Sequence, residues 1–296
     1  MSENFGVVSQ TAPSLFRRIV DFPLSRLLLE VALIGVPLLF ARDVAMGIAA
    51  SQKNAAVDLG AALLVAVAGC LWYVAYARVI AQRNATELPL RGGFRGLGLG
   101  VLLGCGLIAA VALLLVLMGG LSIAASGNVS AAVTGLAYAL VAGVVEEILL
   151  RGIVFRNLED LCGSWFAIAF SAALFGALHL ANPHASLAGA LAIALQAGIL
   201  LAAVYMATRS LWWVIGIHAG WNFAEGGLLG VRVSGTEVHG LFLSTPTGPE
   251  WLSGGEFGIE ASPVATIVCL LVAIFFLRKA RRDRQFIAPL WRRRGN

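Results

Sequence analysis

Long, uninterrupted apolar runs constrain what this chain of 296 residues can fold into. In hydrocarbon, every backbone polar group must be hydrogen-bonded within the protein, which leaves α-helices or closed β-barrels. Barrel strands are segments of about ten residues with alternating polarity, whereas these runs are continuous. Only 12% of the residues are charged and 59% are hydrophobic, while a soluble domain is about a quarter charged. The sequence therefore predicts an all-α fold, a polytopic integral membrane helical bundle.

About eight transmembrane helices are expected, each near the ~17–25 residues needed to cross a bilayer. They are residues 27–50, 57–80, 97–123, 130–155, 164–180, 186–207, 211–230 and 263–277. The glycines at positions 100 and 104 enter the third of these spans, and their i,i+4 spacing predicts close packing of that helix against a neighbour.

The chain divides into five parts on this pattern. An N-terminal arm (1–26) that is cytoplasmic or interfacial precedes three transmembrane helices (27–129). A four-helix core (130–230) and an extracytoplasmic loop (231–262) follow. The last helix and a basic cytoplasmic tail (263–296) complete the chain.

Basic residues gather beside the apolar runs and give the chain a net charge of +5. They form three groups: Arg17, Arg18 and Arg26; Arg78, Arg83, Arg91 and Arg95; and the run from Arg278 to Arg294. Basic flanks of this kind face the cytoplasm and anionic lipid. We therefore expect cytoplasmic N- and C-termini, the plasma (inner) membrane of a prokaryote as location, the lipid bilayer as partner, and no nucleic-acid partner.

Three short polar patterns interrupt the apolar helices. They are Glu146-Glu147-xxx-Arg151, Phe175-xxx-His179 and His218-xxx-Asn222. Ionisable side chains at membrane depth are costly, so such a set indicates a functional site. Two carboxylates, two imidazoles and an amide suit the activation of water and the stabilisation of an oxyanion.

The spacing of the first pattern gives its two glutamates different surroundings. Glu147 and Arg151 are four residues apart on a helix, so they share a face and can pair. Glu146 points about 100° away, which makes it the candidate general base. The alternative is that all three residues form one charge network that only holds helices together.

The second and third patterns also have i,i+4 spacing. The ring of Phe175 can pack beside His179 and set its orientation, and His218 and Asn222 can present hydrogen-bond donors to one point, as an oxyanion requires. The alternatives are a structural histidine at a helix end and a hydrogen bond between helices.

The three patterns together resemble the motifs of the CAAX-protease and bacteriocin-processing (CPBP) family, which includes the type II CAAX prenyl endopeptidases. The resemblance covers about residues 130–230 and implies that these four helices are the catalytic core. It implies an intramembrane endopeptidase in which Glu146 and His179 activate water, His218 and Asn222 form the oxyanion hole, and Glu147, Arg151 and Phe175 support them. It implies membrane protein or peptide substrates, from lipidated CAAX-type proteins to leader peptides. The oligomeric state is left open.

Zinc is the alternative to a metal-free mechanism. Glu146, His179 and His218 would make a set of three protein ligands with one position left for water. The sequence has no HExxH pattern, and an amide such as that of Asn222 suits an oxyanion better than a metal. We therefore expect no metal and a glutamate-activated water.

Two other functions use the same residues. A non-catalytic membrane scaffold or immunity-type partner would keep the fold without the reaction, and a proton-coupled transporter would use Glu and His as a relay.

The proposed pairing of Glu146 with His179 also requires that the two side chains lie at the same depth in the membrane. In an up-and-down bundle, Glu146 and His179 lie at different depths unless the fourth helix runs on to Asp160 or the fifth is tilted.

Overall fold

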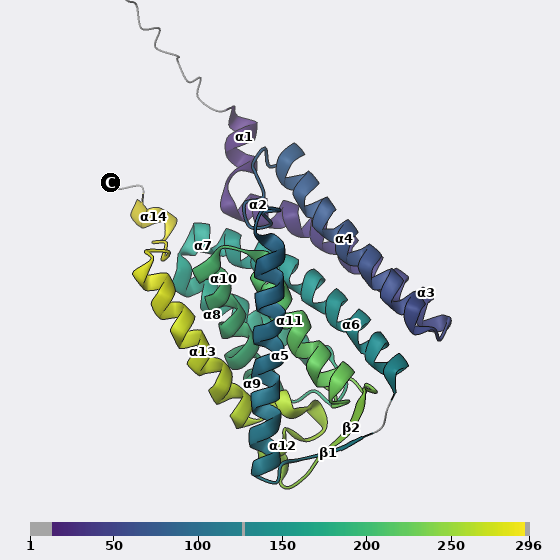
Figure 1. The fold of residues 1–296 in the computed structure, drawn as a ribbon. Coiled ribbons are helices and arrows are strands. Elements are labelled where there is room, and N and C mark those ends of the chain that lie inside the picture. The colour runs from purple at the N-terminus through teal and green to yellow at the C-terminus, as the bar shows by residue number, and fades with distance from the viewer. Residues whose placement is uncertain (1–13, 126–127, 294–296) are drawn as a thin grey trace, which may run out of the picture.

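The computed structural model describes residues 14–125 and 128–293, and Figure 1 shows them as one bundle of long helices. Residues 1–13 of the predicted N-terminal arm lie outside this part. The first half consists of α1 (Leu15–Val20), α2 (Pro23–Glu30), the π-helical segment η1 (Val31–Gly35), α3 (Val36–Ser51), α4 (Ala55–Val79), α5 (Gly93–Leu117) and strand β1 (Leu121–Ala125).

The second half begins with one long helix made of α6 (Val129–Glu147), the π-helical η2 (Ile148–Phe155) and α7 (Arg156–Cys162). Next come α8 (Ser164–Leu178), η3 (His179–Ala181), α9 (Leu187–Ile193), η4 (Ala194–Gly198), α10 (Ile199–Thr208), α11 (Leu211–Asn222) and η5 (Phe223–Leu228). The chain ends with β2 (Phe242–Pro246), α12 (Glu250–Ser253), η6 (Gly255–Phe257), η7 (Ile259–Ala261), α13 (Pro263–Arg282) and α14 (Leu290–Arg293).

Seven helices in the described residues are long and apolar enough to cross a membrane, which confirms the predicted polytopic bundle. The predicted span at 211–230 is not among them, because His218 and Asn222 in α11 and Glu225 in η5 make this segment less apolar than the others. The predicted span at 97–123 is too long. Its helix ends at Leu117, and after a turn at Gly119 and Gly120 the chain continues as strand β1.

Helix α11 lies between α5 and α6 and is buried along nearly its whole length. Glycines allow its close approach to α5. A Cβ atom added at Gly104 would lie 2.2 Å from the carbonyl oxygen of Ile217, and one at Gly216 would lie 2.4 Å from that of Leu97. This contact confirms the close packing predicted from the glycine spacing, and it fixes the helix that carries His218 and Asn222.

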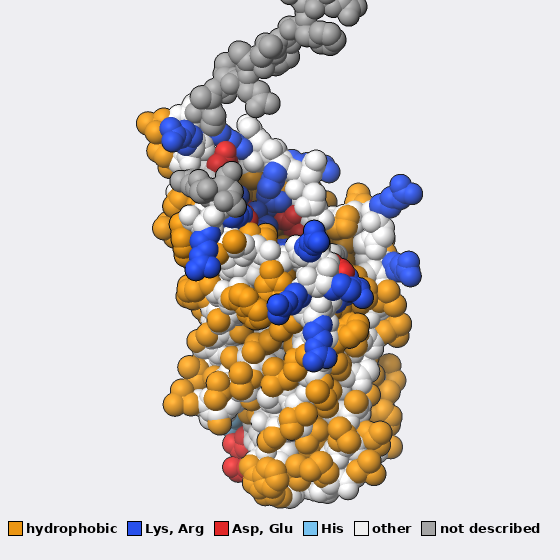
Figure 2. Space-filling model, turned by 90° about the vertical axis from the view of Figure 1, so that its left-hand side faces the viewer, with side chains coloured by type: hydrophobic (Ala, Val, Ile, Leu, Met, Phe, Trp, Pro, Cys, Tyr) orange, Lys and Arg blue, Asp and Glu red, His pale blue; other side chains and the backbone are white. Residues whose placement is uncertain are grey.

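The two ends of the bundle differ in structure and charge. The first and last described helices, α1 and α14, lie with α2 and α7 at one end, called here the end with the termini, while β1, β2 and α12 lie at the other (Figure 1). The strands pair antiparallel, with Leu121 opposite Pro246. On the face drawn in Figure 2, Lys and Arg gather toward the end with the termini, and hydrophobic side chains cover most of the rest.

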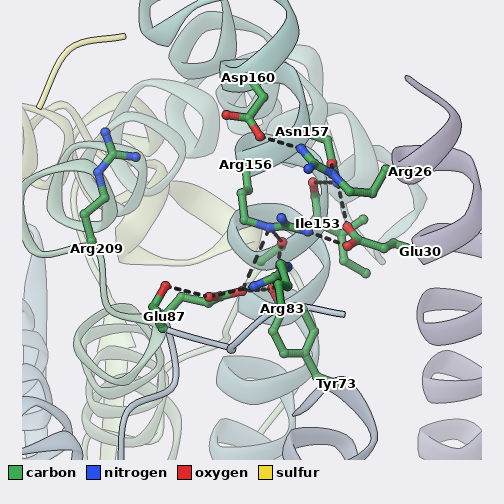
Figure 3. Close-up of polar contacts among 12 residues, drawn as sticks. Arg26, Glu30, Tyr73, Arg83, Glu87, Ile153, Arg156, Asn157, Asp160 and Arg209 are labelled. Carbon is green, nitrogen blue, oxygen red and sulfur yellow. Dashed lines mark hydrogen bonds and ion pairs between the residues drawn. The ribbon is translucent and has the colours of Figure 1, made fainter. Parts of the chain in front are cut away.

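An ion-pair network holds the helices together at the end with the termini (Figure 3). Arg156 pairs with Glu30, and Arg83 pairs with Glu87 at 2.8 Å. The hydroxyl of Tyr73 donates to Glu87. Burial acts to raise the pKa of Glu87, but the hydrogen bond and charge of Arg83, with Arg156 and Tyr73, prevail and lower it. The network therefore keeps this end closed and charged.

Candidate functional site

The long helix from Val129 to Cys162 positions the first pattern of residues. It continues past Asp160, so Glu146 lies near its middle, about 25 Å from its first residue at 1.5 Å per residue. The fourth span therefore meets the condition under which Glu146 can reach the depth of His179.

Glu147 and Arg151 form a pair that is completely buried. Arg151 Nη1 donates to Glu147 Oε1 at 3.0 Å, as their i,i+4 spacing predicted. Arg151 Nη2 also donates to the carbonyl of Gly198 at 3.1 Å, at the end of the π-helical segment η4. The guanidinium carbon lies 4.9 Å from the centre of the Phe175 ring. This arginine thus has a carboxylate, a carbonyl and an aromatic face as partners.

His218 connects the two glutamates. Its Nδ1 lies 2.8 Å from Glu147 Oε1, and its Nε2 lies 4.0 Å from Glu146 Oε2. A carboxylate paired with arginine only accepts hydrogen bonds, so Nδ1–H of His218 donates to Glu147. Glu147 therefore orients the imidazole, and Nε2 is left facing Glu146. The contact with Glu147 was missed in the sequence, which grouped His218 with Asn222 or, as alternative zinc ligands, with Glu146 and His179.

The orientation of His179 is set by its own helix. His179 Nδ1 lies 2.7 Å from the carbonyl oxygen of Phe175, and the two rings are 4.7 Å apart. A carbonyl oxygen only accepts, so Nδ1 carries a proton, and in the neutral ring the lone pair is on Nε2. The Phe175 ring also lies 5.9 Å from that of His218, edge to face. The predicted packing of Phe175 against His179 is present, and the same ring separates the two imidazoles.

Glu146, His179, His218 and Asn222 all line one cavity of about 810 Å³. They come from three different helical segments, which the fold brings to this cavity, and their roles stay predictions. The side chain of Glu146 is 27% exposed, whereas that of Glu147 is not exposed at all. The adjacent glutamates therefore differ as expected: one faces the cavity and the other is enclosed with Arg151.

Two buried acidic residues beside the site were not predicted. Glu225 accepts a hydrogen bond from Trp221 Nε1 at 2.9 Å, and Glu260 accepts one from the backbone N–H of Ser234. Glu260 lines a small cavity together with His179, His218 and Asn222. Glu225 could have been found as a lone acid three residues after Asn222. Glu260 lies in a polar loop, where nothing in the sequence indicates burial.

The loop between η5 and α13 is therefore part of the site. Burial raises the pKa of Glu260, against the opposing effect of the Ser234 N–H. Gln196 Nε2 donates to the backbone carbonyl of Glu260 at 2.7 Å and ties the loop to the helical core. In the described residues, no group of three or more His, Cys, Asp or Glu side chains is placed to hold a metal ion.

Residues 128–224 match a family model described as Type II CAAX prenyl endopeptidase Rce1-like. The matched segment runs from the start of α6 into η5 and includes all seven residues of the three patterns. The resemblance drawn from those patterns is thereby confirmed over this segment. Neither a curated protein nor a solved structure matches the chain.

Proposed function

We propose that this protein is an intramembrane endopeptidase that hydrolyses peptide bonds of membrane-associated substrates with a glutamate-activated water. The membrane-spanning bundle and the protease family matched by residues 128–224 support hydrolase activity. One observation carries the proposal: Glu146, His179, His218 and Asn222 line a single cavity inside a bundle of apolar helices.

Glu146 and His179 would activate the water. The Glu146 carboxylate faces the cavity and, among the described residues, pairs with no arginine, while the Nε2 lone pair of His179 is available because Nδ1–H donates to Phe175. A water held between these two acceptors gives one proton to Glu146 as its oxygen attacks the scissile carbonyl carbon. General-base assistance of this kind contributes about 10²–10⁴-fold in rate.

His218 and Asn222 would stabilise the oxyanion that forms. Asn222 supplies an amide N–H, and protonated His218 supplies Nε2–H while Nδ1–H remains on Glu147. The two flanking carboxylates favour the imidazolium form. Glu146 then returns its proton to the leaving amide nitrogen, and the C–N bond breaks to give a carboxylic acid and an amine. The second proton of the water passes from this acid, by way of His179 Nε2, to the amine, so a carboxylate and an ammonium group are released. Each proton taken from water is thus accounted for.

No step of this reaction uses a metal. The neutral amide of Asn222 and the carboxylate-bound imidazole of His218 suit hydrogen bonding to an oxyanion. We propose a metal-free reaction on this chemistry, and dependence on added zinc would contradict it.

The protein would lie in the plasma membrane of a prokaryote with both termini in the cytoplasm. The basic residues at the end of the bundle with the termini support this orientation by the positive-inside rule. Its substrates would be membrane-associated proteins or peptides, of the lipidated CAAX type or with a leader segment, as in the family that residues 128–224 match.

The test compares new peptide termini in membranes from cells with wild-type protein and with Glu146→Gln. The amide keeps the size of the side chain but cannot accept the proton, so termini produced by the enzyme should vanish at equal protein abundance. Glu250→Gln, an exposed acid in α12, is the matched control and should keep them. Identical termini in all three strains would refute proteolysis and favour the non-catalytic scaffold.

A further inference from the structure

The wall of the 810 Å³ cavity follows one half of the long helix. Its lining includes Asn128, Ser130, Thr134, Tyr138, Ala142 and Glu146. These residues run from the start of α6, at the end of the bundle with the β-strands, to the middle of the helix. The cavity therefore extends from that end to the catalytic residues.

Polar residues from two further segments form the outer part of this wall. Arg42 and Asp43 come from α3, and Thr236, Glu237 and His239 come from the loop after η5. Asp43, Thr236, Glu237 and His239 are exposed, and Arg42 is partly exposed. A polar, accessible rim of this kind can admit water and a peptide backbone.

The opposite direction is closed. Directly beyond Glu146, the side chains of Glu147, Arg151, Ile153 and Phe155 have no exposed surface. Beyond them, Arg156 and its partners form the buried ion-pair network of Figure 3. None of the described residues that line the large cavity comes from 148–162, from 80–95 or from 278–293. Among the described residues, the cavity therefore has no opening toward the end with the termini.

Charge distinguishes the two ends of the molecule. The closed end carries most of the described basic residues, among them Arg83, Arg95, Arg209 and Arg281. Toward the open end lie Lys53 after α3 and Arg232 after η5, and Arg42 lies within α3. Acidic residues at the open end include Asp43, Glu237, Glu250 and Glu256. By the positive-inside rule, the closed end lies in the cytoplasm and the open end outside it.

We infer that the catalytic cavity receives its substrate from the extracytoplasmic side. The substrate class is an extended peptide segment of an exported or membrane-anchored protein, and lipidated tails confined to the cytoplasm are excluded. A volume of about 810 Å³ falls in the range of ~300–1,000 Å³ for ligand pockets, which suits a short stretch of chain and no folded domain. This inference rests on the proposed protease function and narrows its substrates.

Thiol labelling from one side of the membrane tests the direction of entry. Single cysteines replace Ala142 deep in the cavity, Ala131 nearer its mouth, Thr236 at the rim and Arg281 at the basic end, in a chain with Cys70, Cys105, Cys162 and Cys269 changed to alanine. A charged, membrane-impermeant maleimide is added to intact cells and, separately, to permeabilised cells. The cysteine-free parent measures background.

We expect Ala142→Cys, Ala131→Cys and Thr236→Cys to be labelled in intact cells, and Arg281→Cys only after permeabilisation. The two cavity positions support each other if one variant is poorly produced. Labelling of Arg281→Cys in intact cells, or of the cavity positions only after permeabilisation, would overturn the inference. So would cavity cysteines that remain unlabelled from both sides while Thr236→Cys reacts.

The labelling does not depend on cleavage, so the two proposals fail separately. If the cavity labels from outside and Glu146→Gln changes no peptide termini, the protease function fails and the direction of access stands. If termini vanish in Glu146→Gln but lie in cytoplasmic segments of their proteins, the protease function stands and this inference fails.

Discussion

At the scale of single residues, neighbouring glutamates acquire different surroundings from their positions on one helix. Glu147 meets Arg151 one turn later and also orients His218, while Glu146 faces the cavity. The i,i+4 spacing was sufficient to predict the first pair. The contact between Glu147 and His218 joins residues 71 positions apart, and such a contact depends on how helices pack, which no local pattern specifies.

Arg151→Ala should lower the free energy of unfolding by ~3–5 kcal/mol, because it leaves the Glu147 charge buried without its partner. Arg282→Ala, which removes an exposed arginine beside Asp283, should change it by about 0.5 kcal/mol or less. Chemical unfolding of both purified variants in detergent measures the difference. An equal loss of unfolding free energy in the two variants would contradict a stabilising role of the buried Glu147–Arg151 pair.

The raised pKa of Glu260 predicts a pH-dependent stability. Burial raises this pKa above the ordinary value of 4.5, so the folded protein binds the proton more tightly than the unfolded chain. The stabilisation is fully present below pH 4.5 and is lost as the pH rises through the pKa of the folded state. Glu225 and His179 are titratable groups that also influence this pKa.

Thermal unfolding of wild type and Glu260→Gln between pH 4 and 8 tests whether stability falls as the pH rises. The Tm of the wild type should fall more steeply above pH 4.5 than that of the variant. Glu256→Gln, at an exposed acid in the same loop, should follow the wild type. Parallel curves for wild type and Glu260→Gln would contradict the prediction.

At the scale of helices, the apolar runs and the Gly100–Gly104 spacing predicted most elements and one helix contact. The wrong end of the predicted span at 97–123 and the missed π-helical segments have physical causes. The segment at 121–125 is apolar enough to extend a helix, but a left-handed turn at Gly119 ends α5 and the segment pairs with β2 instead. The π-helical segments η2 and η5 follow directly after Glu147 and Asn222. Such bulges often mark functional sites, and no composition signal shows them in advance.

Gly104→Ala should destabilise the protein by ~1–3 kcal/mol, the typical cost of overpacking. Its Cβ would meet the Ile217 carbonyl at 2.2 Å and force α11 away from α5. Because α11 carries His218 and Asn222, activity should fall as well. Gly106→Ala is the matched control on the same helix, since no described atom lies within 4 Å of its new Cβ. Unfolding and cleavage assays on both variants check the prediction, and equal effects would refute the role of the contact.

At the scale of the whole molecule, composition alone predicted a membrane bundle. The structure adds that the two ends of this bundle differ. One end is closed by the network around Arg156, and the other opens into the cavity that reaches Glu146. The basic clusters predict that the closed end faces the cytoplasm, and the three polar patterns name four side chains that line the cavity. The cavity could not be predicted, because it lies between α3, α6 and a loop whose polar sequence is typical of an exposed connector.

The most direct measurement of the central claim is the rate of peptide-bond hydrolysis by purified protein in liposomes. The substrate is one identified from the peptide termini that depend on the enzyme, and the assay is run with and without a zinc chelator. We expect the wild type to cleave at the same rate in both conditions and Glu146→Gln to be at least ~100-fold slower, as expected for loss of a general base. Cleavage by Glu146→Gln at a rate close to that of the wild type would contradict the role of Glu146, and loss of wild-type cleavage with chelator would contradict a metal-free reaction.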